Sequence, residues 1–171
     1  MNTTTQMRTS TSVRTQTAVH LTDVITGAFS AIIATLRLSR EALDAHWDTI
    51  ERGLMIWIEE GSLEDVCLEF GDPDAPDAIF EIPITYRFTG VGNVEFVASR
   101  ARLVRLTAKI EEVPQGTSYR VIANHQGSHT AVPGWFATDA ANRSGLSSYN
   151  LGSLGSGPNA SASLNYLTRR T

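Results

Sequence analysis

The stretch Leu106–Asn124, LTAKIEEVPQGTSYRVIAN, predicts a β-hairpin. Apolar residues alternate with polar ones on both sides of Pro114-Gln115-Gly116. This alternation is typical of strands that bury one face, and a proline followed by glycine supplies the chemistry of a tight turn. We therefore expect strands over Leu106–Val113 and Tyr119–Ala123, paired with each other.

The residues before this hairpin fit a helix and a strand about equally well. In Asn93–Arg105 the apolar residues fall on one helical face with Asn93 as the cap, whereas alternation takes over further on. We expect a short helix that gives way to a strand near Leu106.

Two more strands are expected earlier in the chain. Val66–Phe70 alternates and predicts a half-buried strand, with Cys67 and Glu69 on its polar face. The proline-rich stretch 72–77 predicts a loop, because proline cannot donate to a sheet ladder. Phe80–Phe88 alternates again, and Pro83 within it indicates an edge strand or a bulge.

Two long helices precede these strands. Apolar residues at three- and four-residue intervals predict a helix over Ala18–Leu38. A second apolar stripe runs from Leu43 to Ile58, with Ser39 as the expected N-cap and Gly61 as the residue that ends the helix.

The two ends of the chain differ from this middle part. Met1–Thr17 contains seven Thr, two Ser and no acid, and predicts a disordered tail. From Gly127 onward Ser, Gly and Asn dominate around isolated aromatic residues, which indicates an extended arm that packs conditionally. Within it Gly152–Gly157 is interpreted as a flexible linker rather than a phosphate loop, because no lysine is close. The expected organisation is a tail over 1–17, a core over 18–128 and an arm over 129–171.

Composition restricts the class of protein. The chain has 171 residues, of which 42% are hydrophobic and 19% charged, which suits one globular domain. Its net charge of −4 argues against a general nucleic-acid binder. No unbroken apolar run approaches the ~20 residues of a membrane-spanning helix, and the polar N-terminus lacks a signal-peptide core. The single cysteine, Cys67, forms no internal disulfide, which favours a cytoplasmic protein.

No catalytic or metal-binding motif stands out. His125 and His129 are four residues apart but follow a predicted strand, so a metal site is not expected. Residues 41–81 hold thirteen acidic side chains and one basic one, Arg52, which we interpret as a solvated acidic surface. An electrostatic docking patch for a basic partner is the alternative.

The order of these elements resembles the HORMA family. The predicted hairpin, followed by Ala131-Val-Pro-Gly-Trp135, is similar to the region where the mobile "safety belt" begins in the spindle-checkpoint HORMA protein. Ile50–Val66 and Ile82–Phe88 resemble bacterial HORMA proteins encoded beside cyclic-oligonucleotide synthases, the CD-NTases. The resemblance implies an α+β fold, with long N-terminal helices packed on a mostly antiparallel sheet and a C-terminal safety belt over 129–171.

The resemblance also implies a function. HORMA proteins are adaptors without catalytic activity or cofactor that bind a closure-motif peptide as an added strand, over which the belt closes. In the bacterial systems the closed form binds and activates a CD-NTase in anti-phage signalling, and an AAA+ ATPase reopens it. Another HORMA subunit is a further candidate partner, whereas direct nucleic-acid or membrane binding is not expected.

Residue roles follow from the same resemblance. For peptide contact we predict Trp135, Phe136, Tyr149 and Leu151, with the alternative that Trp135 and Phe136 only anchor the hairpin to the core. The C-terminal Ser163–Thr168 is interpreted as the last strand of the belt, in preference to a closure motif for another subunit.

The ATPase is expected to engage the tail around Met7 and Arg8. Two other function classes stay open at this stage. One is a chaperone or scaffold that binds a basic client through its acidic helix, and the other is a small enzyme whose site carries no recognised motif.

Overall fold

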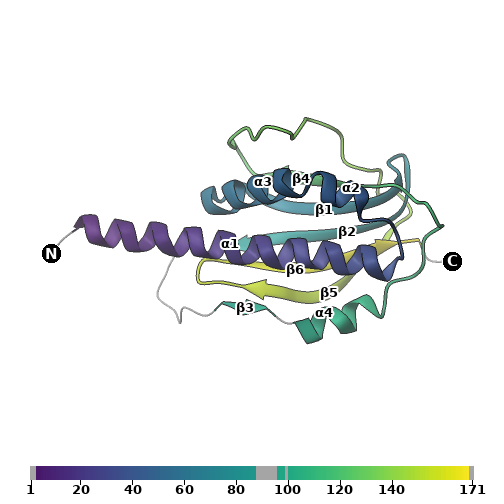
Figure 1. The fold of residues 1–171 in the computed structure, drawn as a ribbon, viewed down its shortest axis with the longest axis horizontal. Helices are drawn as coiled ribbons and strands as arrows, with labels where there is room; N and C mark the ends of the chain where they lie inside the picture. The colour runs from purple at the N-terminus through teal and green to yellow at the C-terminus, as the bar shows by residue number, and fades with distance from the viewer. Residues whose placement is uncertain (1–2, 88–95, 99, 170–171) are drawn as a thin grey trace.

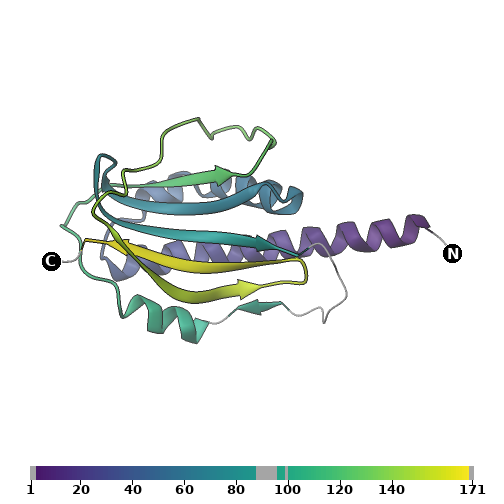
Figure 2. The same cartoon turned by 180° about the vertical axis from the view of Figure 1, so that it is seen from behind.

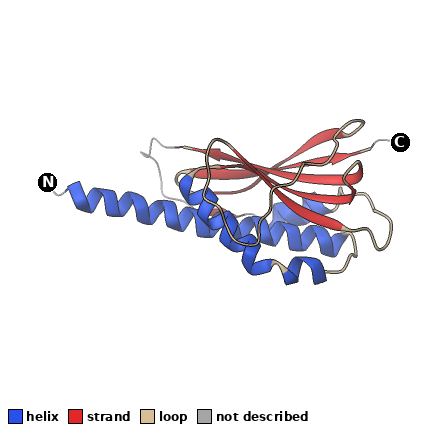
Figure 3. Ribbon diagram, turned by 90° about the horizontal axis from the view of Figure 1, so that it is seen from above, coloured by secondary structure: helices blue, strands red, loops and turns tan. Residues whose placement is uncertain are grey.

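The computed structural model describes residues 3–87, 96–98 and 100–169. The helices lie on one face of a single antiparallel sheet, so the fold has two layers (Figures 1 and 3). The elements, in chain order, are α1 (Thr3–Thr35), α2 (Glu41–Ala45), α3 (Trp47–Glu60), β1 (Leu63–Asp72), β2 (Ala75–Tyr86), β3 (Val97–Ala98), α4 (Arg100–Thr107), β4 (Tyr119–His125), β5 (Ser147–Ser156) and β6 (Ala160–Thr168).

Helix α1 contains the helix predicted over Ala18–Leu38 but begins much earlier, at Thr3. Its apolar stripe packs on the sheet, and Leu21, Ile25 and Phe29 are fully buried. Residues 3–17, predicted above as part of a disordered tail, lie within this helix. Composition indicates only that such a segment cannot bury a face, whereas a helix already nucleated by packing extends outward at one hydrogen bond per residue.

The same helix is long and apolar enough, between Val13 and Thr35, to cross a membrane by length and composition alone. The sequence expectation missed it because threonines interrupt the apolar run. More than half of this stretch is buried in the fold, and core helices of soluble proteins can have the same length and composition.

Helices α2 and α3 together form the second predicted helix, with a break at His46. The N-cap of α2 is Arg40, whose side chain makes no capping hydrogen bond, so the prediction of Ser39 as the cap was wrong by one residue. The Ser39 hydroxyl still accepts the Glu41 N–H at 3.1 Å. Gly61 ends α3 in the left-handed conformation, with φ of 78°, which confirms its predicted role.

The sheet has the strand order β3-β5-β6-β2-β1-β4, and all its pairs are antiparallel. Strand β2 lies inside the sheet, so the edge position or bulge inferred from Pro83 was wrong. Paired residues of β2 and β6 run from Ala78 to Glu81 and resume at Ile84 in the same register, and Pro83 lies in the gap. The turn after β1 is also tighter than predicted, because Pro76 already pairs with Gly71 at a local register shift.

The hairpin predicted over Leu106–Asn124 does not form: only its second strand is present, and that strand pairs with β1. Residues 106–107 end helix α4 and residues 110–114 are irregular, whereas Tyr119–His125 is strand β4 and pairs with β1. The predicted turn is present, since Thr117 N–H donates to the Pro114 carbonyl at 3.2 Å. Leu106 and Val113 are buried in the core and hold this connection in place. The helix cap predicted at Asn93 lies outside the described residues.

The C-terminal arm adds two strands to the sheet. Gly152–Gly157, interpreted above as a flexible linker, lies mostly within β5, where the β5–β6 ladder shifts register twice. Ser163–Thr168 lies in β6, the last strand of the chain, which pairs with β2.

Strand β1 is buried on both faces, although a half-buried strand was predicted. Val66, Leu68 and Phe70 face the helices in the main core. Cys67 and Glu69 are only 0% and 2% exposed. They are covered because residues 139–146, which lead to β5, pass over the other face of the sheet (Figure 2). We call residues 139–146 the crossing segment.

Candidate functional site

Strand β4 forms one edge of the sheet, and its outer backbone groups face a cleft. The Gly71 N–H donates to the Ser118 carbonyl at 2.8 Å, which sets the phase of the β1–β4 ladder. Since antiparallel hydrogen bonds alternate, the N–H and C=O groups of Tyr119, Val121 and Ala123 point away from β1. Within the described part of the chain no strand pairs with this edge.

Residues 129–138 run alongside this free edge, and we call them the roof segment. Between β4, the roof segment and helices α2 and α3 lie two adjoining cavities of about 420 and 350 Å³. Val121 lines both, so together they form one channel along β4, which we call the edge cleft. The larger cavity is lined among others by Leu43, Ile50, Tyr119, Trp135 and Phe136. The smaller is lined among others by Trp57, Ala123, His125, His129, Val132 and Phe136.

Trp135 attaches the roof segment to helix α3. Its indole N–H donates to the Thr49 carbonyl at 2.8 Å, and its ring meets the Trp57 ring edge-on at 4.9 Å between centroids. The ring sits over Gly53, where a Cβ atom would lie 2.5 Å from the Trp135 Nε1 atom. Trp135 is thus an anchor of the roof that also lines the cleft, so it fits both roles considered from the sequence.

Phe136 follows directly and is 85% exposed while lining both cavities. An aromatic side chain this exposed gains little from the fold itself, whereas a ligand in the edge cleft would cover it. Its position agrees with the predicted peptide contact.

Tyr149 and Leu151 lie elsewhere. Both belong to β5, where Tyr149 pairs with Tyr166 and both side chains pack against the main core. Strands β6, β2 and β1 separate β5 from β4. The structure therefore brings Trp135 and Phe136 together and places Tyr149 and Leu151 away from the edge cleft.

Two histidines that the sequence analysis set aside line one end of the cleft. The rings of His125 and His129 stack at 3.6 Å between centroids, and Trp57 packs edge-on against His125 at 4.4 Å. Burial and the neighbouring His129 lower the pKa of His125 below its ordinary value, although Glu60 and Asp65 oppose this effect. The spacing of four residues was the signal in the sequence that the two histidines could act together. Their rings come into contact because the chain reverses after β4.

Glu60 holds the start of the roof segment. One of its carboxylate oxygens accepts the Thr130 N–H at 2.9 Å and the other accepts the Thr130 hydroxyl at 2.6 Å. Burial acts to raise the pKa of Glu60, but hydrogen bonds from Ser62 and Thr130 lower it below its ordinary value. The Trp57 indole N–H donates to the Thr130 carbonyl at 2.7 Å, so the roof is tied to α3 near both of its ends.

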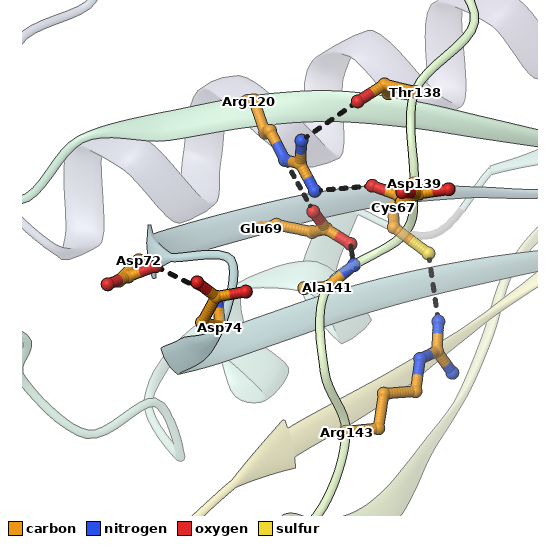
Figure 4. Close-up of polar contacts among 9 residues, drawn as sticks. All are labelled: Cys67, Glu69, Asp72, Asp74, Arg120, Thr138, Asp139, Ala141 and Arg143. Atoms are coloured by element: carbon orange, nitrogen blue, oxygen red, sulfur yellow. Dashed lines mark hydrogen bonds and ion pairs between the residues drawn. The ribbon is translucent and has the colours of Figure 1, made fainter.

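An ion pair between a half-buried arginine and a buried carboxylate fastens the crossing segment to the sheet (Figure 4). The Arg120 guanidinium contacts the Glu69 carboxylate at 2.7 Å and donates to the Asp139 carbonyl at 2.8 Å. The other Glu69 oxygen accepts the Ala141 N–H at 2.9 Å. A buried carboxylate on β1 thus binds both the edge strand and the segment that passes over it.

A second group of polar contacts lies further along the crossing segment. Arg143 pairs with Glu81 on β2 and donates to the Cys67 sulfur at 3.4 Å. Asn165 on β6 donates to the other oxygen of Glu81 at 3.0 Å. Burial raises the pKa of the Cys67 thiol, which keeps it protonated.

These residues also contain the one candidate metal group found in the described ranges. Ligand atoms of Asp65, Cys67 and Glu81 lie within 4.8 Å of one another. The guanidinium of Arg143 already supplies the positive charge there, and the thiol is protonated, so this donor set does not suit a cation. What the site offers is an open strand edge beside an apolar cleft, which is an arrangement for binding an extended chain.

Comparison with known proteins identifies the family. The model of the family described as bacterial HORMA domain 2 matches residues 4–170. No curated protein matches the chain. Among solved structures, C. elegans HTP-2 bound to the HIM-3 closure motif is 14% identical with a TM-score of 0.64, covering 88% of this chain and 89% of that one.

Two further structures are similar. C. elegans HTP-1 bound to the HIM-3 closure motif is 15% identical with a TM-score of 0.65, covering 86% and 87% of the two chains. The E. coli MS115-1 CdnC:HORMA-deltaN complex contains a chain that is 12% identical with a TM-score of 0.61, covering 92% and 90%. The α+β fold expected from the resemblance is confirmed, and the chain belongs to the bacterial HORMA domain 2 family.

Proposed function

We propose that this protein is a non-catalytic adaptor that binds a closure-motif peptide as an added strand on the outer edge of β4. The observation that carries the proposal is the free edge of Tyr119, Val121 and Ala123 along the edge cleft. A peptide paired there would exchange main-chain hydrogen bonds with β4 and place alternate side chains in the cleft.

The path of the C-terminal arm supports a closed latch. From β4 the chain runs back along the open edge as the roof segment and then crosses the sheet to reach β5 and β6 beyond β2 (Figure 2). A peptide in the edge cleft would therefore be enclosed by the roof, the crossing segment and the sheet. Polar contacts hold the crossing segment, and such contacts can be exchanged with water when the belt opens.

The similar structures support this function. Those of HTP-1 and HTP-2 are described as bound to closure motifs, and the E. coli complex pairs a HORMA protein with CdnC. By analogy the closed form binds and activates a CD-NTase in anti-phage signalling in the cytoplasm. An AAA+ ATPase reopens it by pulling on the N-terminal residues around Met7 and Arg8, which the structure places in the first turns of α1. A second HORMA subunit is a further candidate partner.

The sharpest test replaces Val121 with proline. The Val121 N–H points away from β1, so Val121→Pro removes a donor from the free edge and leaves the β1–β4 ladder intact. Proline at the next residue, Ile122→Pro, is the matched control, because the Ile122 N–H faces β1 and its loss should lower the melting temperature strongly.

The ligand is selected from a displayed library of random short peptides panned against the full chain, and its affinity is measured by fluorescence polarisation. Val121→Pro should abolish peptide binding while the melting temperature changes little. Undiminished binding by a folded Val121→Pro variant would refute the added-strand model. Binding lost instead on charge reversal at Asp44, Asp48 and Glu51 would favour the acidic scaffold.

A further inference from the structure

The two cavities of the edge cleft differ in chemistry. The larger one lies against α2 and α3, and its walls include the buried side chains of Leu43 and Ile50. Tyr119 closes this end, because its hydroxyl donates to the Ser39 carbonyl at 2.6 Å and accepts the Leu43 N–H at 3.2 Å. The smaller cavity is bordered by both imidazoles, of His125 and His129.

The larger cavity suits a bulky apolar side chain. Phe136 stands beside it with 85% of its surface exposed, and Ile50 is only 5% exposed. A leucine or aromatic side chain inserted between them would remove from water the exposed surface of Phe136 and its own apolar surface.

His125, which lines the smaller cavity, carries an unsatisfied polar atom. The Nε2 atom of His125 is buried and has no hydrogen-bond partner in the part of the chain that the structure describes. A buried polar atom left unpaired is unfavourable, so a ligand group that pairs with it gains affinity. The groups that face this imidazole are His129 from the roof segment, Glu60 from α3 and Asp65 from β1, and the lowered pKa of His125 keeps it neutral at pH 7.

The register of β4 relates the two cavities to each other. Tyr119, Val121 and Ala123 all pack toward the helices, because side chains of one strand alternate between its faces. Val121 borders both cavities, while Tyr119 borders only the larger and Ala123 only the smaller. Side chains of an added strand that enter both cavities must therefore lie on one face of that strand, an even number of residues apart.

We propose that the peptide bound by this protein carries a bulky apolar side chain and, two or four residues away, a hydrogen-bonding side chain that pairs with Nε2 of His125. This inference rests on the proposed function and adds the chemical pattern of the ligand. The apolar side chain fills the cavity beside Leu43 and Ile50, and the polar one fills the cavity beside the stacked histidines.

The test uses peptides enriched from the random library on the full-length wild-type chain. The enriched sequences should share an apolar residue and a polar residue at even spacing. Alanine in place of the apolar residue should weaken binding at least tenfold, and alanine in place of the polar residue about fivefold.

Two protein variants assign these effects to the cavities. Phe136→Ala should weaken binding several-fold, whereas Val104→Ala, which truncates another exposed apolar side chain on α4, should not. His125→Phe keeps the ring volume and removes both ring nitrogens. This variant should bind the polar peptide and its alanine version with equal affinity. The difference between this result and the preference of the wild type is the coupling energy that a double-mutant cycle measures.

The outcomes separate this inference from the proposed function. Peptides that need the Val121 edge but show no even-spaced pattern, or a His125→Phe variant that still prefers the polar peptide, would overturn the inference and leave the added-strand function standing. Peptides that bind Val121→Pro as tightly as the wild type would overturn both.

Discussion

Gly53 in α3 gives the Trp135 ring room to dock, so Gly53→Ala should detach the roof segment. A Cβ atom at this position would lie 2.5 Å from Nε1 and 2.9 Å from Cε2 of Trp135, and 2.9 Å from Cζ3 of Trp57. Real Cβ contacts essentially never fall under 3.0 Å, so both contacts must lengthen, and the contact with Trp135 is the shorter. Trp57 is the more tightly held, because it is 2% exposed and lies in the core.

Opposing effects determine the size of the change. Alanine in place of a glycine within a helix stabilises it by about 0.5–1 kcal/mol. Overpacking at a filled site costs about 1–3 kcal/mol, and loss of the Trp135–Thr49 hydrogen bond adds about 1 kcal/mol. The expected net loss is about 1–3 kcal/mol, or a melting temperature lower by roughly 2–12 °C for a chain of this size.

Gly27→Ala in α1 is the matched control. A Cβ atom there would meet nothing within 4 Å, so this substitution should only gain helix propensity, about 0.5–1 kcal/mol. The assay is thermal unfolding of both variants, together with limited proteolysis within residues 129–138. Gly53→Ala should melt lower and be cleaved faster in the roof segment, and Gly27→Ala should do neither. Equal stabilisation by both substitutions would refute the docking of Trp135 on α3.

Three further predictions concern the crossing segment and the histidines. Arg120→Ala leaves the Glu69 carboxylate buried without its ion-pair partner and should lower the free energy of unfolding by at least about 2 kcal/mol in a urea titration; an unchanged midpoint would contradict the role of this pair. Arg143→Ala removes a contact that holds the crossing segment over Cys67, which is 0% exposed in the wild type. A thiol reagent should therefore modify Cys67 faster in the variant, and equal rates would show that Arg143 does not hold the segment in place. The pKa of His125 is lowered in the folded chain, so the unfolded chain binds more protons just below pH 6.5, and stability should fall as the pH falls through that value. Unfolding at pH 7.5 and 5.5 tests this, and His125→Gln should reduce the difference.

The helices and several strands could be predicted from the sequence, because their signals are local. The apolar stripe of Ala18–Leu38 and the C-terminal cap Gly61 depend on neighbours within one or two turns of helix. The alternation in Val66–Phe70 likewise indicates a strand without reference to its partner.

The sequence also identified two residues of the candidate site. Trp135 and Phe136 stand out as aromatic residues in a polar arm, and both line the edge cleft. Tyr149 and Leu151 stand out for the same reason, yet they pack in β5 beyond three intervening strands. Composition separates residues that pack from residues that do not, but it carries no information about which surface they meet.

Tertiary structure decided the rest. Leu106–Val113 alternates as a strand would. However, the edge of β1 pairs with Tyr119–His125 instead, and residues 100–107 form helix α4. Glu69 has the pattern of an exposed residue until the crossing segment, some seventy residues later, covers it. The edge cleft is likewise formed by segments distant in sequence, and their contact depends on which strands pair. Local periodicity determines the elements of this protein, while long-range pairing, whose energy depends on the whole sheet, determines where its binding edge is left open.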